Sequence, residues 1–178
     1  MKKSVCIIVC ALTVATFAYA FESPTALGFG LGDAAGNMGI NLELSSPSFI
    51  SGIFTIRAES QMDFLSAYKD NPDVAWETFS SHKIGIAAAP GRTKGPIRLY
   101  GEFGGLLVLP AESVSGDTMQ WGIYGYFGFE FYETPETSPI AYYIECGTNS
   151  LFAEADKLPD SPDYYSGFTV RTGLRYYF

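Results

Sequence analysis

The sequence predicts an all-β fold, an up-and-down barrel of eight antiparallel strands that spans a membrane. Aromatic residues make up 16% of the chain and there are 19 glycines, while only 17% of the residues are charged. After Ala20, no apolar run approaches the roughly 18 residues that a membrane-spanning helix needs. Apolar residues instead occupy every second position of many short segments, which is typical of the strands of a membrane barrel.

Residues 1–20 are predicted to be a cleaved signal peptide. Two lysines precede an apolar run that ends in the small-x-small pattern of residues 18–20, which signal peptidase cuts. The predicted mature domain therefore covers residues 21–178. Both cysteines of the signal segment leave with it, so Cys146 remains alone and no internal disulfide is expected.

Eight segments show the alternation that places the side chains of a strand on two opposite faces. In the last segment, Phe168 and Leu174 share one face, while Arg171 and Arg175 share the other. The seven earlier segments separate apolar from polar positions in the same way, and an even number of strands fits a closed antiparallel barrel. The predicted strands cover residues 25–32, 38–44, 49–60, 82–89, 97–109, 119–132, 140–149 and 165–178.

The polar faces of these segments carry all the charges that the alternation assigns, five acids and five bases. A charge that faces lipid at the membrane midplane costs roughly 2–4 kcal/mol, whereas opposite charges inside a barrel can pair. We therefore predict that the apolar faces contact lipid and that the polar faces fill the interior with a salt-bridge network; the alternative is a soluble, lipocalin-like barrel. The predicted network contains Glu43, Arg57, Glu59, Lys83, Arg98, Glu102, Glu130, Glu145, Arg171 and Arg175.

The depth of these residues along the strands predicts two separate groups. The upper group contains Arg57, Glu59 and Lys83, and the lower group contains the other seven residues. Eight strands enclose a lumen only wide enough for side chains. A diffusion pore is therefore not expected.

The connections between the predicted strands alternate in length. The links at 45–48, 90–96 and 133–139 are short or rich in turn residues, whereas those at 61–81 and 150–164 are long. Short periplasmic turns and long extracellular loops are the bacterial outer-membrane arrangement, which places both chain ends in the periplasm. The acids in excess over bases are predicted to lie outside the lumen, in loops open to basic partners or divalent cations. They include Asp63, Asp70, Asp73, Glu77, Glu154, Asp156, Asp160 and Asp163.

Aromatic side chains near the strand ends are expected to face the membrane interfaces. Trp and Tyr are enriched at this depth, where they form girdles around a membrane protein. The predicted girdle residues are Trp121, Phe131, Tyr132, Tyr142, Tyr164, Tyr165 and Tyr176.

The closing stretch RTGLRYYF resembles the C-terminal assembly signal of outer-membrane barrels, carried here by Arg171, Gly173, Tyr176 and Phe178. In that family the barrel assembly machinery recognises the last strand, and an extended edge strand can pair with the sheet of an assembly factor. Together with the strand pattern, this ending makes the chain resemble the small eight-stranded outer-membrane barrels of diderm bacteria, of the OmpX/Ail, OmpA-barrel and OmpW types. The resemblance implies an outer-membrane location and contact with its lipid.

We expect a non-enzymatic monomer without cofactor, metal or nucleic acid, which acts as a surface-exposed envelope-integrity or adhesion and host-interaction protein. One alternative is an OmpW-like channel for small or hydrophobic solutes. The resemblance implies an apolar lumen for that branch, from which the predicted polar lumen departs. A second alternative is an outer-membrane lipid-modifying hydrolase in which His82 activates the Ser80 hydroxyl. Glu77 has the opposite parity to His82, and the local motif of that family is not matched.

Overall fold

The computed structural model describes residues 24–68, 73–89, 96–132 and 138–178. The predicted signal peptide, Asp70 and most of the links at 90–96 and 133–139 lie outside these ranges. Eight strands form a closed barrel in sequence order, each antiparallel to its neighbours, which confirms the predicted fold class. The strands are β1 (Ala26–Ala34), β2 (Asn37–Ser45), β3 (Phe54–Phe64), β4 (Thr78–Ala88), β5 (Ile97–Leu109), β6 (Gln120–Tyr132), β7 (Ile140–Leu151) and β8 (Gly167–Tyr177).

The described residues contain one short helix, η1 (Ser66–Tyr68), which follows β3. No helix in this part of the chain is long and apolar enough to cross a membrane.

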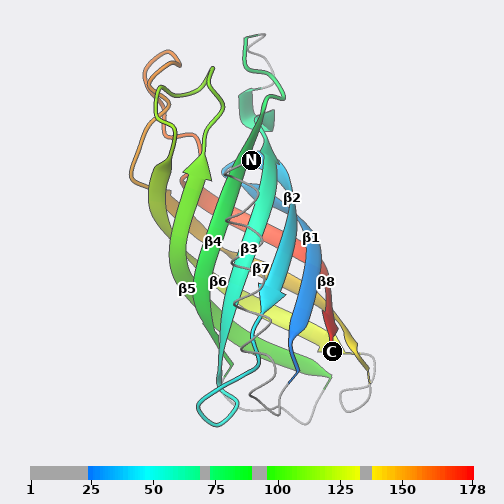
Figure 1. Ribbon diagram of the computed structural model, residues 1–178. Helices are drawn as coiled ribbons and strands as arrows, with labels where there is room; N and C mark the ends of the chain where they lie inside the picture. The colour runs from blue at the N-terminus through cyan, green and yellow to red at the C-terminus, as the bar shows by residue number, and fades with distance from the viewer. Residues whose placement is uncertain (1–23, 69–72, 90–95, 133–137) are drawn as a thin grey trace, which may run out of the picture.

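The two ends of the barrel differ, as Figure 1 shows. At the end that we call the turn end lie residues 46–53, the close of β4 and of β6, the start of β5 and of β7, and the close of β8. At the opposite end, the loop end, lie the tight turn between β1 and β2 and three longer connections. These longer connections cover residues 65–77, 110–119 and 152–166.

The barrel closes where β1 pairs with β8. Leu27 lies opposite Tyr176, and Gly32 lies opposite Arg171. Two further backbone hydrogen bonds join Thr25 and Phe178, at 3.1 and 2.9 Å between nitrogen and oxygen. The inward positions of β1 are all small residues: Ala26, Gly28, Gly30, Gly32 and Ala34.

Three strand boundaries differ most from the prediction. The third strand begins at Phe54 rather than at residue 49, because Ile50, Ser51 and Gly52 have positive φ angles and turn the chain. It also continues to Phe64, and β4 begins as early as Thr78. The loop predicted at 61–81 is therefore shorter, and its two flanks belong to the barrel wall.

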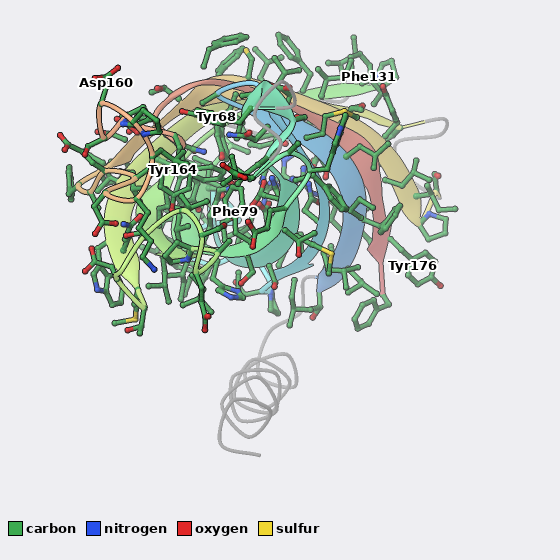
Figure 2. The ribbon with its side chains drawn as sticks, turned by 90° about the horizontal axis from the view of Figure 1, so that it is seen from above. Tyr68, Phe79, Phe131, Asp160, Tyr164 and Tyr176 are labelled. Atoms are coloured by element: carbon green, nitrogen blue, oxygen red, sulfur yellow. The ribbon has the colours of Figure 1, made fainter. Side chains whose placement is uncertain are left out.

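The two faces of the wall match the alternation in the sequence. Phe103 and Ile84 are 65% and 63% exposed on the outside, whereas Tyr100 and Glu145 are buried inside. Seen from above in Figure 2, Phe79 and Tyr164 lie within the ring of strands, while Phe131 and Tyr176 project outside it. The apolar faces thus point outward, as predicted for a membrane barrel and not for a soluble one.

Candidate functional site

The interior of the barrel is the candidate site, because it gathers buried charged side chains from seven strands. Nine of the ten predicted network residues are buried, and only the side chain of Arg98 remains partly exposed, at 23%. Each strand contributes through its inward parity, so a residue two positions along the strand points the same way. The nine buried residues are Glu43, Arg57, Glu59, Lys83, Glu102, Glu130, Glu145, Arg171 and Arg175.

Among the buried bases, Arg175 makes the most side-chain hydrogen bonds. Its guanidinium donates to both carboxylate oxygens of Glu43, each at 2.7 Å. It also donates to Glu130 and Glu145 at 2.6 Å and to the Tyr100 hydroxyl at 2.7 Å. A fully buried guanidinium needs this many acceptors, since an unpaired charge in the interior would be costly.

The two charge groups predicted as separate are joined into one, so that part of the prediction is wrong. Arg57, assigned to the upper group, lies 2.9 Å from Glu102 and 3.4 Å from Glu145. Arg171 contacts both Glu59 and Glu145, and so connects the two depths. Long arginine side chains span more than one level of the barrel, which depth along the strand does not reveal. We call these buried residues, with Arg98, the charge network.

Asp63 is a buried acid that the sequence analysis placed in a loop. It lies on β3 with no exposed surface and faces inward, on the same side of the strand as Arg57 and Glu59. The prediction ended this strand at residue 60 and therefore missed it. Extending the alternation through Gln61 to Asp63 would have found it. With Asp63, the described residues that face the interior include six acids and five bases.

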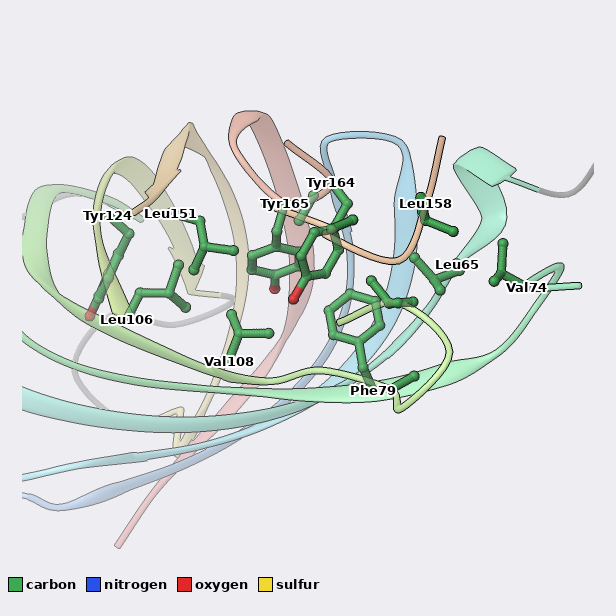
Figure 3. Close-up of a cluster of buried hydrophobic side chains, with 14 of the residues drawn as sticks. Leu65, Val74, Phe79, Leu106, Val108, Tyr124, Leu151, Leu158, Tyr164 and Tyr165 are labelled. Carbon is green, nitrogen blue, oxygen red and sulfur yellow. The ribbon is translucent and has the colours of Figure 1, made fainter. Parts of the chain in front are cut away.

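Above the charge network, the loop end of the interior contains a cluster of hydrophobic side chains. Inward side chains of β4 to β7 meet side chains that the three long connections direct into the barrel (Figure 3). We call this set the mouth cluster. It contains Ala34, Leu65, Val74, Phe79, Leu106, Val108, Ala111, Val114, Tyr124, Tyr126, Leu151, Ala155, Leu158, Tyr164 and Tyr165.

The mouth cluster corrects the predicted aromatic girdle at two positions. Tyr164 and Tyr165 are fully buried inside the barrel and do not face an interface. Both rings pack edge-on against Phe79, with centroids 5.6 and 5.4 Å away. Burial raises the pKa of the Tyr165 phenol well above its usual value, so the hydroxyl stays neutral and can donate a hydrogen bond.

A third girdle residue also faces the interior, at the turn end. The Tyr132 hydroxyl donates to Glu130 at 2.9 Å, and its ring packs against that of Tyr177. Trp121, Tyr142 and Tyr176 are exposed on the outer wall. Parity separates these cases: Tyr132 shares the inward face of Glu130 on β6, two positions along the strand.

Known structures share this architecture. No protein-family model matches the chain, and no curated protein sequence matches it significantly. The N-terminal β-barrel domain of Pseudomonas aeruginosa OprF matches with a TM-score of 0.60 and 9% identity, over 88% of this chain and 98% of that one. The chain has the fold of the small eight-stranded outer-membrane barrels. The Yersinia pestis outer membrane protein Ail, in a phospholipid bilayer nanodisc, matches with a TM-score of 0.52 and 13% identity, over 88% of this chain and 100% of that one.

The residues of the hydrolase alternative lie on the outer wall of this outer-membrane barrel fold. Ser80 and His82 are half-buried on the outward face of β4, and they pair with Met62 and Ser60 across the sheet. The Glu77 carboxylate instead accepts a hydrogen bond from the Ser113 hydroxyl. The structure does not assemble Ser80, His82 and Glu77 into a hydrogen-bonded triad within its described residues.

The residues of the predicted assembly signal divide between the two faces of β8. Tyr176 and Phe178 project outward with their rings stacked, whereas Arg171 belongs to the charge network. Gly173 faces inward, where a Cβ atom would collide with the Phe29 carbonyl oxygen and lie 2.8 Å from the Tyr143 ring. Contacts inside the barrel therefore explain why arginine occupies position 171 and glycine occupies position 173. Recognition by an assembly factor stays a prediction.

The acidic loops form no ion site within the described residues. No three His, Cys, Asp or Glu side chains there are arranged to hold a metal. A surface cavity of about 480 Å³ at the loop end is lined by Asp117, Phe152, Glu154, Asp156 and Asp163, among others. Asp156 and Asp163 already accept hydrogen bonds from backbone N–H groups of Gly116 and Ser166. Those two carboxylates thus stabilise the conformation of the connections at the loop end.

Proposed function

We propose that this protein is an outer-membrane barrel with a closed interior, which acts at the cell surface in envelope integrity or adhesion. The observation that carries the proposal is that the interior is filled at both levels. The charge network occupies the part near the turn end, and the mouth cluster occupies the part near the loop end. A barrel of eight strands has room for little more than side chains.

The outer wall supports the membrane location. Within the described strands, the only charged side chain on the outward face is Asp33, at the loop end of β1. Most of the exposed large hydrophobic residues are outward residues of strands, such as Leu42, Phe103 and Leu174. The fold is also that of Ail, an outer membrane protein studied in a phospholipid bilayer. An apolar band of this kind is stable in lipid and unstable in water.

The lengths of the connections support the proposed orientation. Bacterial barrels of this class have short periplasmic turns and longer extracellular loops. In this orientation the turn end, with both chain ends of the barrel, faces the periplasm, and the loop end faces outward. The exposed acids Glu154 and Asp160 then lie at the cell surface. Partners that carry positive charge would be attracted to this end.

The proposal is tested in three measurements. Planar bilayers that contain the purified protein should show no conductance at the level of an open porin. Epitope tags inserted beside Asp160 should be accessible on intact cells, and tags beside Ser51 should not. A deletion strain should lose serum survival or attachment to host matrix, and the wild-type gene should restore it. Porin-level conductance, or a deletion strain that matches its parent in both assays, would overturn the proposal.

The solute-channel alternative has one observation in its favour. The resemblance to its branch implies an apolar lumen, and the mouth cluster is apolar, contrary to the wholly polar lumen that we predicted. That space is filled by Leu158, Tyr164 and Tyr165 of the β7–β8 connection. A channel would require these side chains to move and the charge network beneath them to separate.

A further inference from the structure

The Tyr165 side chain lies in the barrel interior, although Tyr165 belongs to the β7–β8 connection. Its ring is fully buried and packs edge-on against Phe79, at an interplanar angle of 85°. The neighbouring ring of Tyr164 lies 6.5 Å away, centroid to centroid. In Figure 3 both tyrosines enter from the β7–β8 connection toward side chains of the strands below. An aromatic ring of the connection thus fills a space inside the barrel beside Phe79 and Tyr164, which we call the slot.

The polar end of this slot is built from the strands. The Ser81 hydroxyl donates its single proton to Asp63, at 2.8 Å. The Tyr165 oxygen lies 2.8 Å from the Ser81 oxygen and 3.2 and 3.3 Å from the two Asp63 oxygens. Tyr165 donates to Asp63 whichever hydroxyl donates to the other, because an ionised carboxylate only accepts. The slot thus offers acceptors to a hydroxyl group.

Asp63 is well suited to hold such a donor. Among the described residues, no Lys or Arg nitrogen lies within 4.0 Å of its carboxylate, and the nearby Lys83 pairs with Glu59 at 2.8 Å. The Gln61 amide and the Ser81 hydroxyl are its other donors. A buried carboxylate without a cation depends on hydrogen-bond donors for its stability. Loss of the Tyr165 hydroxyl would leave part of this requirement unmet.

The β7–β8 connection is held by the tyrosines together with several other contacts. Residues 152–166 contain no strand or helix. They are held by the tyrosines, by a hydrogen bond from Tyr164 to Gln120 at 2.8 Å, by hydrogen bonds within the connection, and by contacts to the β5–β6 connection. The Lys157 backbone N–H, for example, donates to the Val114 carbonyl at 3.1 Å. Tyr165 is the anchor that reaches Ser81 and Asp63.

We propose that the barrel mouth contains a phenol-binding site made by Phe79, Ser81 and Asp63, and that Tyr165 is its intramolecular ligand. The site selects a flat aromatic ring that carries one hydroxyl donor. Occupation by Tyr165 holds the β7–β8 connection over the barrel. A free phenol occupies the same site when the tyrosine side chain is removed. This inference does not depend on where the protein acts or on what it binds at the surface.

A single-atom change tests the hydroxyl. Tyr165→Phe keeps the ring and removes only the donor. Lys157 is the one trypsin site in the described part of this connection, and its cleavage reports how often the connection opens. Loss of a hydrogen bond to a charged group should raise cleavage after Lys157 about tenfold, because proteolysis follows the open population. Tyr142→Phe, on the outer wall, is the matched control and should leave cleavage unchanged. Equal cleavage of wild type and Tyr165→Phe would overturn the proposal.

A rescue experiment tests the ligand. Tyr165→Ala should be cleaved faster still after Lys157, and p-cresol should slow that cleavage whereas toluene at the same concentration should not. The two probes differ by the hydroxyl, so a difference between them reports Ser81 and Asp63. If Tyr165→Ala does not reach the heat-modifiable folded form, p-cresol added during refolding should raise the folded yield and toluene should not. Equal effects of the two probes, or no effect of either, would overturn the site.

Discussion

Arg171 illustrates how much a single side chain contributes to the stability of the fold when it is buried between charged partners. It is buried and pairs with Glu59 and Glu145. Removing one partner of a buried pair leaves the others uncompensated. Arg171→Ala should therefore lower the free energy of unfolding by about 3–5 kcal/mol. Urea titration, followed by tryptophan fluorescence and by heat-modifiable migration, measures the change.

The matched control is an acid that makes no such pairs. Asp160→Ala alters an exposed residue of the β7–β8 connection, at a positive φ angle that alanine adopts less readily than aspartate. Its cost should stay within about 1 kcal/mol, well below that of Arg171→Ala. If Arg171→Ala and Asp160→Ala unfold at the same urea concentration, the charge network does not stabilise the barrel.

Two adjacent glycines of β5 provide a second test at this scale. A Cβ atom at Gly104 would collide with the Ile84 carbonyl oxygen and lie 2.5 Å from the Gly85 Cα atom, whereas one at Gly105 would meet nothing within 4 Å. Gly104→Ala should force β4 and β5 apart and lower the yield of folded barrel. Gly105→Ala should fold as well as wild type. Refolding yields on a heat-modifiability gel compare the two, and equal yields would contradict this packing.

Parity in the sequence assigns a face to each strand residue, yet it does not assign partners. The alternation is a local property of the backbone, so the inward side of Glu145 or Arg175 can be read directly from the chain. Which carboxylate a guanidinium reaches depends on strand tilt and on side-chain length. For this reason the separation of Arg57 from the lower group was wrong.

At the scale of elements, strand ends were harder to predict than strand centres. The prediction ended β3 at residue 60 because Gln61 and Asp63 have the polarity of loop residues. In the structure both are inward residues of the strand. Its start was placed too early because Phe49 and Ile50 resemble strand residues, although positive φ angles at Ile50 and Ser51 turn the chain there. Similarly, Tyr164 and Tyr165 resembled girdle residues until the fold showed the connection entering the barrel. Local pattern does not distinguish an apolar residue that faces lipid from one that a loop buries.

The contact between two loop-end connections should respond to acid. The Ser115 hydroxyl and the Gly116 N–H group donate to Asp156, and these bonds hold the pKa of its carboxyl below the usual value. A depressed pKa means that the contribution is present above the ordinary value of about 4 and is lost as pH falls through the folded-state value. The protection factor of the Gly116 amide, measured by NMR, should therefore fall in acid.

Asp156→Asn is the control for this titration. The amide cannot ionise, so the protection of Gly116 should no longer follow a carboxyl titration in this pH range. A loss of protection in acid that is the same in Asp156→Asn would assign the effect to another group.

At the scale of the whole molecule, the outer wall makes a quantitative prediction about lipid. Ile84 lies near the middle of β4 and is 63% exposed. A lysine that faces lipid at the midplane costs roughly 2–4 kcal/mol. Ile84→Lys should therefore reduce folding into phospholipid vesicles, whereas Asp160→Lys, in the loop-end connection, should not. Equal folding of the two variants would contradict a lipid-facing wall.

The small inner face of β1 has a consequence for the way the barrel closes. β1 brings only glycine and alanine to the interior, so no side chain of its inner face has to interlock when it meets β8. The aliphatic stems of Arg175 and Arg171 lie over Gly28 and Gly32, with Cγ atoms 3.5 and 3.0 Å from the positions that a Cβ would take. A slip of one residue would turn Phe29 and Leu31 against these stems. The β1–β8 seam can thus form late, through backbone hydrogen bonds alone, and Arg171 and Arg175 of β8 fix its register.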